Sequence, residues 1–152
     1  MRKQLYIAAA LQLTFCWVLP AQSTILFQTT TPPTAGQPSG GTISSTQYIG
    51  NYFVLTTPSH VDSISTAASV TDNGTIFGAI LAVSNLTTLP AGTPFGTSGP
   101  TAPLVTTTLK PNSTNALVSG SAPVDLPAGA YVLIFGTGQF GATSGTAART
   151  GA

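Results

Sequence analysis

Short runs of β-branched and aromatic residues, separated by glycine- and proline-rich turns, constrain the fold of this chain more than any other sequence feature. No long window beyond the N-terminal segment shows the apolar spacing and capping residues of a helix. Roughly six short strands at regular spacing, with turn residues between them, are typical of an antiparallel sandwich. The sequence therefore predicts a single all-β domain built as an antiparallel β-sandwich. The expected strands cover residues 47–57, 60–71, 75–83, 104–109, 116–121 and 131–135.

The N-terminus has the pattern of a secretory signal peptide over residues 1–23. Arg2 and Lys3 precede an apolar stretch over 5–19, and small residues lead to a cleavage site between Ser23 and Thr24. The apolar stretch is shorter than the roughly 20 residues that a membrane span requires. We expect a protein that is secreted, extracellular or held at the cell surface, with no membrane span in the mature chain.

The mature chain carries very little charge. After removal of 23 residues, 152 − 23 = 129 residues remain, with two basic and three acidic side chains and a net charge of 2 − 3 = −1. Two basic residues cannot neutralise a phosphate backbone or an anionic membrane surface, so no nucleic-acid partner is expected. The single cysteine, Cys16, lies in the signal peptide, so the mature chain has no disulfide and no cysteine-based zinc site.

The mature chain divides into three parts. Residues 24–46 are rich in Thr, Pro and Gly and predict a linker or long N-terminal loop. Residues 47–147 form the expected sandwich domain, and residues 148–152 form a tail. Within the domain, Asn73-Gly74 predicts a hairpin turn, because both residues tolerate positive φ. Alternation along 60–71 places Ile64 in the core.

Gly136-x-Gly138-x-x-Gly141 follows an apolar strand and matches the dinucleotide-binding fingerprint on paper. In that fingerprint the third glycine opens a helix whose N-terminus faces the pyrophosphate. The residues that follow here, ATSGTAARTGA, have no apolar stripe and two further glycines. The pattern instead indicates a buried strand that ends in a glycine-rich bend.

Candidate catalytic and metal-binding residues are few. His60 and Asp62 lie two apart and could join a serine in a triad, but no G-x-S-x-G elbow is present. Asp62, Asp72 and Asp125 are the only carboxylates, too few to predict a glycosidase pair or a calcium site. The sequence thus predicts no enzyme activity and no catalytic, cofactor-binding or metal-binding residue. Sequons at Asn73, Asn85 and Asn112 leave glycosylation open.

Carbohydrate binding is the alternative function. β-Sandwich modules bind sugars on exposed aromatic platforms, and the only tryptophan, Trp17, is removed with the signal peptide. Phe53, Phe77, Tyr131 and Phe135 lie in core-like runs, whereas Tyr48, Tyr52 and Phe95 are the candidates for exposed, carbohydrate-binding aromatic residues. This alternative predicts that they line one exposed face.

Three segments resemble a known group of proteins. TTPSHVDSIS, NGTIFGAILAVSNLTTLPAGTPF and VDLPAGAYVLIFGTGQFGATSGTA are similar to secreted bacterial β-sandwich proteins that carry a C-terminal PEP-CTERM sorting signal. The likeness covers about residues 47–147, and the last segment is its most specific part. The resemblance implies a jelly-roll-like sandwich in an exported, surface-located or exopolysaccharide-associated protein, with no assigned activity.

The chain departs from these relatives at its C-terminus. They continue through further strands to a Pro-Glu-Pro motif, an apolar span and basic residues, whereas this chain stops at Ala152. A truncated member and a released, unsorted member are both compatible with this difference. The expected function is a non-catalytic structural role outside the cell, with an extracellular polysaccharide or the cell-surface matrix as partner.

Overall fold

The structure is a computed structural model that describes residues 24–28, 41–87, 102–114, 116–144 and 146–149. The described residues contain eight β-strands and no helix. In chain order these are β1 (Thr42–Ser44), β2 (Ile49–Leu55), β3 (Ser59–Val70), β4 (Ile76–Ala82), β5 (Val105–Leu109), β6 (Ala116–Leu126), β7 (Gly129–Gly136) and β8 (Thr146–Arg149). The predicted all-β class is confirmed.

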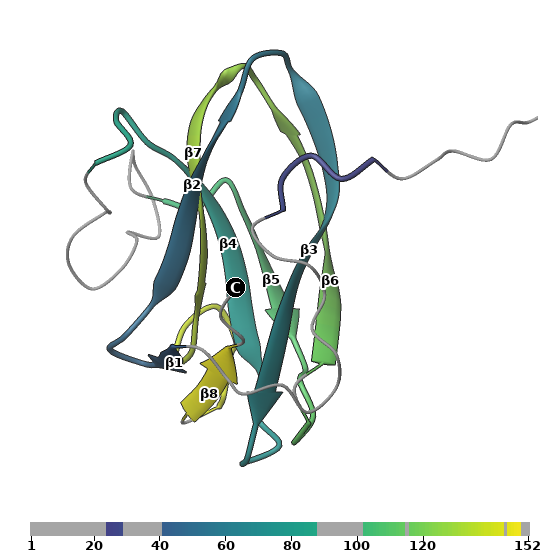
Figure 1. The fold of residues 1–152 in the computed structure, drawn as a ribbon, viewed down its shortest axis with the longest axis vertical. Coiled ribbons are helices and arrows are strands. Elements are labelled where there is room, and N and C mark those ends of the chain that lie inside the picture. Colours follow the sequence, from purple (N-terminus) through teal and green to yellow (C-terminus); the bar gives the residue numbers. More distant parts are fainter. Residues whose placement is uncertain (1–23, 29–40, 88–101, 115, 145, 150–152) are drawn as a thin grey trace, which may run out of the picture.

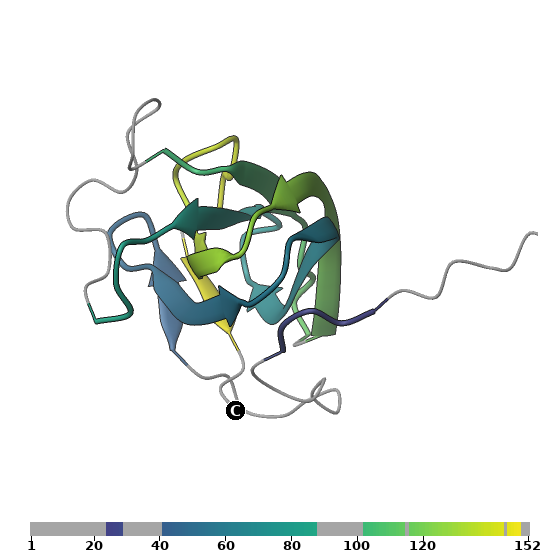
Figure 2. The same ribbon diagram turned by 90° about the horizontal axis from the view of Figure 1, so that it is seen from above.

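The strands form two four-stranded sheets in which every pairing is antiparallel (Figures 1 and 2). One sheet has the order β1-β8-β3-β6 and the other the order β2-β7-β4-β5. Only β4 and β5 are both consecutive in the chain and paired with each other. Every other connection passes from one sheet to the other. The pairing confirms that the fold is all-β and antiparallel, as predicted. The resemblance to a jelly roll stays a prediction.

The two sheets share one hydrophobic core. Its buried members come from both sheets, as in Ile43 and Ile64 of the first sheet and Ile80 and Phe135 of the second. Ile64 is 3% exposed, as the alternation of its strand predicted. Burial of such side chains supplies the main stabilisation of a domain of this size.

The outer face of the β2-β7-β4-β5 sheet carries a second apolar cluster. Phe77, Leu81 and Val132 are almost fully buried there, and Phe140 and Ala142 from the segment after β7 pack against them. β4 is therefore buried on both faces, which explains its continuous apolar sequence IFGAILA.

The predicted hairpin at Asn73-Gly74 is wrong. Asn73 does adopt a positive φ of 55°, so the turn itself forms. However, β3 pairs with β6 and β8, whereas β4 pairs with β5 and β7. The turn therefore connects the two sheets. Local residues specify the turn geometry, but the partners of the flanking strands are decided by packing.

The sequence did not predict β1 and β8, which pair with each other and, through β8, with β3. β1 lies inside the segment 24–46 that was expected to be a linker or loop, and β8 extends past residue 147. Both strands are short, so period-2 alternation cannot be recognised in them. Their pairing shows that the folded unit includes Thr42 and Arg149.

Candidate functional site

The glycines after β7 serve packing and turn geometry. A Cβ atom on Gly136 would lie 2.1 Å from Cδ1 of Tyr48 and 2.6 Å from Cζ of Phe77, so only glycine allows these rings to pack here. Gly138 and Gly141 have φ of 76° and 81°, in the left-handed region that favours glycine. β7 ends at Gly136 and a turn follows, with no helix in the described residues. The predicted glycine-rich bend is confirmed.

The candidate carbohydrate-binding tyrosines do not form an exposed platform. Tyr48 and Tyr52 are half-buried and pack against the outer cluster around Phe77. The Tyr48 hydroxyl donates to the carbonyl of Ser45 at 2.6 Å, and burial raises the pKa of this hydroxyl. The Tyr52 hydroxyl is buried, and among the described residues it has no hydrogen-bond partner. Phe95 lies outside the described residues, so its role stays a prediction.

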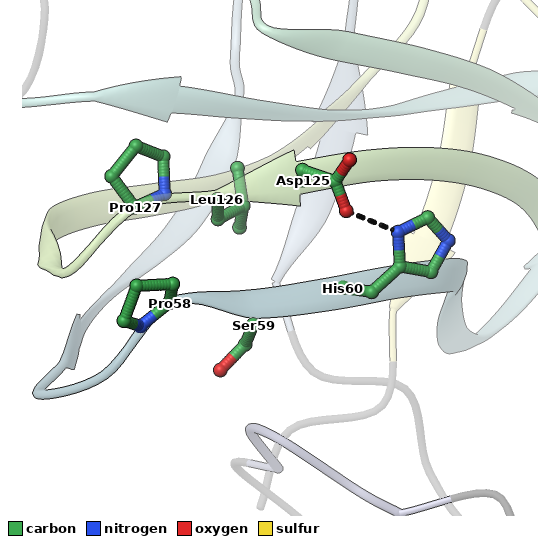
Figure 3. Close-up of a pocket in the computed structure, with 6 residues that line it drawn as sticks. All are labelled: Pro58, Ser59, His60, Asp125, Leu126 and Pro127. Atoms are coloured by element: carbon green, nitrogen blue, oxygen red, sulfur yellow. Dashed lines mark hydrogen bonds and ion pairs between the residues drawn. The ribbon is translucent and has the colours of Figure 1, made fainter.

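In the described part of the chain, three side chains lie together on the outer face of β3 and β6: His60, Asp62 and Asp125. His60 lies directly opposite Asp125 in the antiparallel pairing, and its Nδ1 is 2.6 Å from Asp125 Oδ1 (Figure 3). Its Nε2 is 3.4 Å from Asp62 Oδ1. The imidazole is thus held between two carboxylates, one on its own strand and one on the neighbouring strand.

His60 and Asp62 lie two residues apart on β3, so ordinary alternation puts both side chains on one face of the sheet. The pairing of β3 with β6 shifts between Val61 and Ser63, where Ala122 and Pro123 oppose a single residue. Strict alternation would put Ile64 on that same face, but the bulge changes the parity of β3 after Asp62, so that Val61 and Ile64 both pack on the core. Asp62 is then exposed on the His60 side. A proline suits this position because it has no N–H to pair.

The sequence singled out His60 and Asp62 but missed Asp125 as their partner. Asp125 is 65 residues from His60 along the chain. Their proximity depends on the register between β3 and β6, for which the local sequence carries no signal. The only sequence signal for this contact is that a protonated histidine and an aspartate, here His60 and Asp125, can form an ion pair.

A shallow pocket of about 410 Å³ adjoins the His60–Asp125 pair. It is formed where β3 begins and β6 ends, at the end of the molecule where the β2–β3 and β6–β7 connections meet (Figures 1 and 3). Its lining consists of Pro58, Ser59, His60, Asp125, Leu126 and Pro127. Pro58, Leu126 and Pro127 are its apolar lining residues, and Ser59, His60 and Asp125 are its polar ones.

Electrostatics at this site favour the charged imidazole. The hydrogen bond with Asp125, together with the negative charges of Asp125 and Asp62, raises the pKa of His60 above its ordinary value of 6.5. Half of the His60 side chain is exposed, and Asp62 and Asp125 are almost fully exposed. Solvent screening therefore limits how far these charges interact.

The serine in the pocket is not placed as a nucleophile. Ser59 Oγ donates to the carbonyl of Thr57 at 3.2 Å, and Figure 3 shows it pointing away from His60. A nucleophile needs a hydrogen bond with its base, and no such bond joins Ser59 to the imidazole. His60 can therefore bind and release a proton, but the Ser-His contact of a catalytic triad is not formed by Ser59.

The three aspartates do not converge. Asp72 Oδ1 accepts hydrogen bonds from the Gly74 amide at 2.9 Å and from Ser144 Oγ at 3.0 Å, so it supports the turn between the sheets. Asp62 and Asp125 lie on either side of His60. In the part of the chain that the structure describes, no three His, Cys, Asp or Glu side chains are placed to hold a metal ion together.

No family model matches the chain, and no curated protein has a matching sequence. Among the described residues, no helix is long and apolar enough to cross a membrane.

Proposed function

We propose that this chain is an exported, non-catalytic β-sandwich protein that acts structurally outside the cell or at its surface, in association with a polysaccharide. The signal-peptide pattern and the resemblance to secreted sandwich proteins support export. The low charge supports a neutral partner, because electrostatic attraction to a charged polymer requires clustered charges.

The observation that carries the proposal is a patch of uncharged hydroxyl groups on the outer face of β3 and β6, next to the His60 cluster along the same two strands. Ser63 lies opposite Ser121, and Ser65 lies opposite Ser119, with all four side chains exposed. The hydroxyls of Ser65 and Ser119 form a hydrogen bond of 2.7 Å across the strands. We call these four residues the serine face. Hydroxyls both donate and accept hydrogen bonds, which suits contact with the hydroxyls of a neutral sugar polymer.

Thermal unfolding of residues 24–152 in the presence of individual polysaccharides tests this function. A ligand that binds only the folded protein raises the midpoint, by about 2.7 kcal/mol of stabilisation at 100 times its Kd. We expect a neutral polysaccharide to raise the midpoint and an anionic one to have less effect. The S65A/S119A variant should lose this shift, whereas T106A, which removes an exposed hydroxyl from the other sheet, should keep it.

Export is tested separately by expressing residues 1–152 and sequencing the N-terminus of the released protein. The proposal expects Thr24 as the first residue of protein recovered outside the cytoplasm. Retention of the uncleaved chain inside the cell would contradict it, whatever the polysaccharide results.

A further inference from the structure

One side of the sandwich is open along much of its length. β2 is the edge strand of its sheet, and in the facing sheet β8 pairs with β3 at Ala68–Val70. Among the described strands, residues 59–66 of β3 have β6 as their sole partner, so the other edge of this stretch adjoins no strand. Phe53 of β2 and Val61 of β3 lie on the two sides of this opening, half-buried and packed against the core. The core can therefore be reached from this side.

Residues 24–28 lie across this opening. Both views place the segment outside the strands, on the side that faces the viewer in Figure 1 (Figures 1 and 2). The ring of Phe27 stacks on that of Phe53, with the ring centroids 4.8 Å apart and the planes inclined by 22°. Phe53 stacks in turn on the buried ring of Tyr131 at 5.4 Å. Such separations are typical of stacked aromatic pairs, so the three rings form one stack that runs from the surface into the core.

Phe27 is the residue that holds this segment in place. It is half-buried, whereas the side chains before it, Ile25 and Leu26, are 72% and 42% exposed. Non-specific apolar attraction would favour the burial of all three side chains alike, because each gains a similar free energy from leaving water. The segment instead inserts one ring, so its placement depends on the stack with Phe53.

An uncovered strand edge is a site for self-association. Its N–H and C=O groups can pair with a strand of another molecule, and natural proteins cover such edges or protect them with charged side chains, lysine above all. Residues 59–66 carry one carboxylate, Asp62, and no lysine. The partner that fits this edge is a second copy of the chain, because two β3 strands can pair antiparallel about a two-fold axis.

We propose that residues 24–28 form a latch, held by Phe27, that closes the open side of the sandwich and keeps the edge of β3 from pairing with β3 of a second copy. While the latch is docked, the protein is a monomer. Release of the latch uncovers both the ring of Phe53 and the strand edge, and two copies then pair through residues 59–66. This inference concerns assembly, and it depends neither on export nor on a polysaccharide partner.

The F27A variant of residues 24–152 tests the latch. In the unsubstituted protein we expect nuclear Overhauser effects between the ring protons of Phe27 and Phe53, and the mass of a monomer by multi-angle light scattering. F27A should unfold at a lower urea midpoint in dilute solution, and its mass should rise toward that of a dimer as its concentration increases. I25A, which truncates an exposed side chain of the same segment, should keep both the midpoint and the monomer mass.

Two double variants identify the edge that pairs. F27A/S63K should stay monomeric, because it places like charges on the two β3 strands that would meet. F27A/T106K adds the same charge to β5, an edge strand of the other sheet, and should still dimerise. Far-ultraviolet circular dichroism establishes that each variant is folded.

Three results would overturn the proposal. The first is the absence of any nuclear Overhauser effect between Phe27 and Phe53 in the unsubstituted protein. The second is an F27A variant that stays monomeric at every concentration. The third is an F27A/S63K variant that dimerises as readily as F27A, which would show that the β3 edge is not the contact.

Discussion

At the residue scale, Gly136 is the position where packing leaves least room for a side chain. Its Cβ would lie 2.1 Å from Tyr48 Cδ1 and 2.6 Å from Phe77 Cζ, so the G136A variant must displace both rings. We expect G136A to lower the free energy of unfolding by about 1–3 kcal/mol, as for other overpacked sites. In G129A the nearest atom is Tyr131 Oη at 3.4 Å, so urea unfolding should show little change for this control.

His60 gives the molecule a residue-scale pH dependence. Because Asp125 and Asp62 raise its pKa in the folded state, folding favours the protonated imidazole. The resulting stabilisation is fully present below pH 6.5, the unfolded value, and is lost as the pH rises through the higher folded pKa. NMR titration should give a lower His60 pKa in D125N than in the unsubstituted protein. Equal pKa values would show that the 2.6 Å contact does not persist in solution.

At the scale of elements, Asp72 fastens the β3–β4 connection to the segment that precedes β8. Its carboxylate accepts from the Gly74 amide and from Ser144 Oγ, and Ser144 is 3% exposed. D72A removes both hydrogen bonds and leaves the buried Ser144 hydroxyl without this acceptor. We expect a loss of about 1–3 kcal/mol in urea unfolding, as for hydrogen bonds to charged groups.

Two comparisons support the interpretation of that loss. S144A keeps the Gly74 contact and should cost less than D72A. K110Q, which changes an exposed charge, should be nearly neutral. A D72A variant as stable as K110Q would show that the hydrogen bonds in this turn contribute nothing to the stability of the connection.

At the scale of the whole molecule, the position of β1 extends the folded unit beyond the domain boundary expected from the sequence. Ile43 lies in the segment that was interpreted as a linker, yet it is fully buried in the core shared by the two sheets. We expect I43A to lower the free energy of unfolding by about 2–4 kcal/mol, the usual cost of removing a buried isoleucine side chain to Cβ. Chemical denaturation of residues 24–152 measures this change.

The matched whole-molecule control is L117A, because Leu117 is 54% exposed on β6. It should change the unfolding midpoint much less than I43A. Similar midpoints for both variants would mean that residues 42–44 do not belong to the cooperative unit.

The sequence by itself determined the fold class and the buried strand β4. β-Branched and aromatic runs between turn residues leave no amphipathic helix to form, and a strand that is apolar on both faces must be covered on both. The local turn at Asn73 and the glycine-rich bend after Gly136 were also predictable, because positive φ and close backbone approach restrict which residues can occupy them.

Only the tertiary structure decided which strands pair, where the folded unit begins, and which side chains meet. Asn73-Gly74 joins two sheets instead of two paired strands, and β1 gains its order from β8 and the core. His60 meets Asp125 because β3 pairs with β6 in one register, and a bulge after Asp62 lets Ile64 of the same strand face the core while His60 and Asp62 stay exposed. These outcomes follow from contacts between distant segments, whose free energies depend on the packed molecule and are not encoded in any local window of the chain.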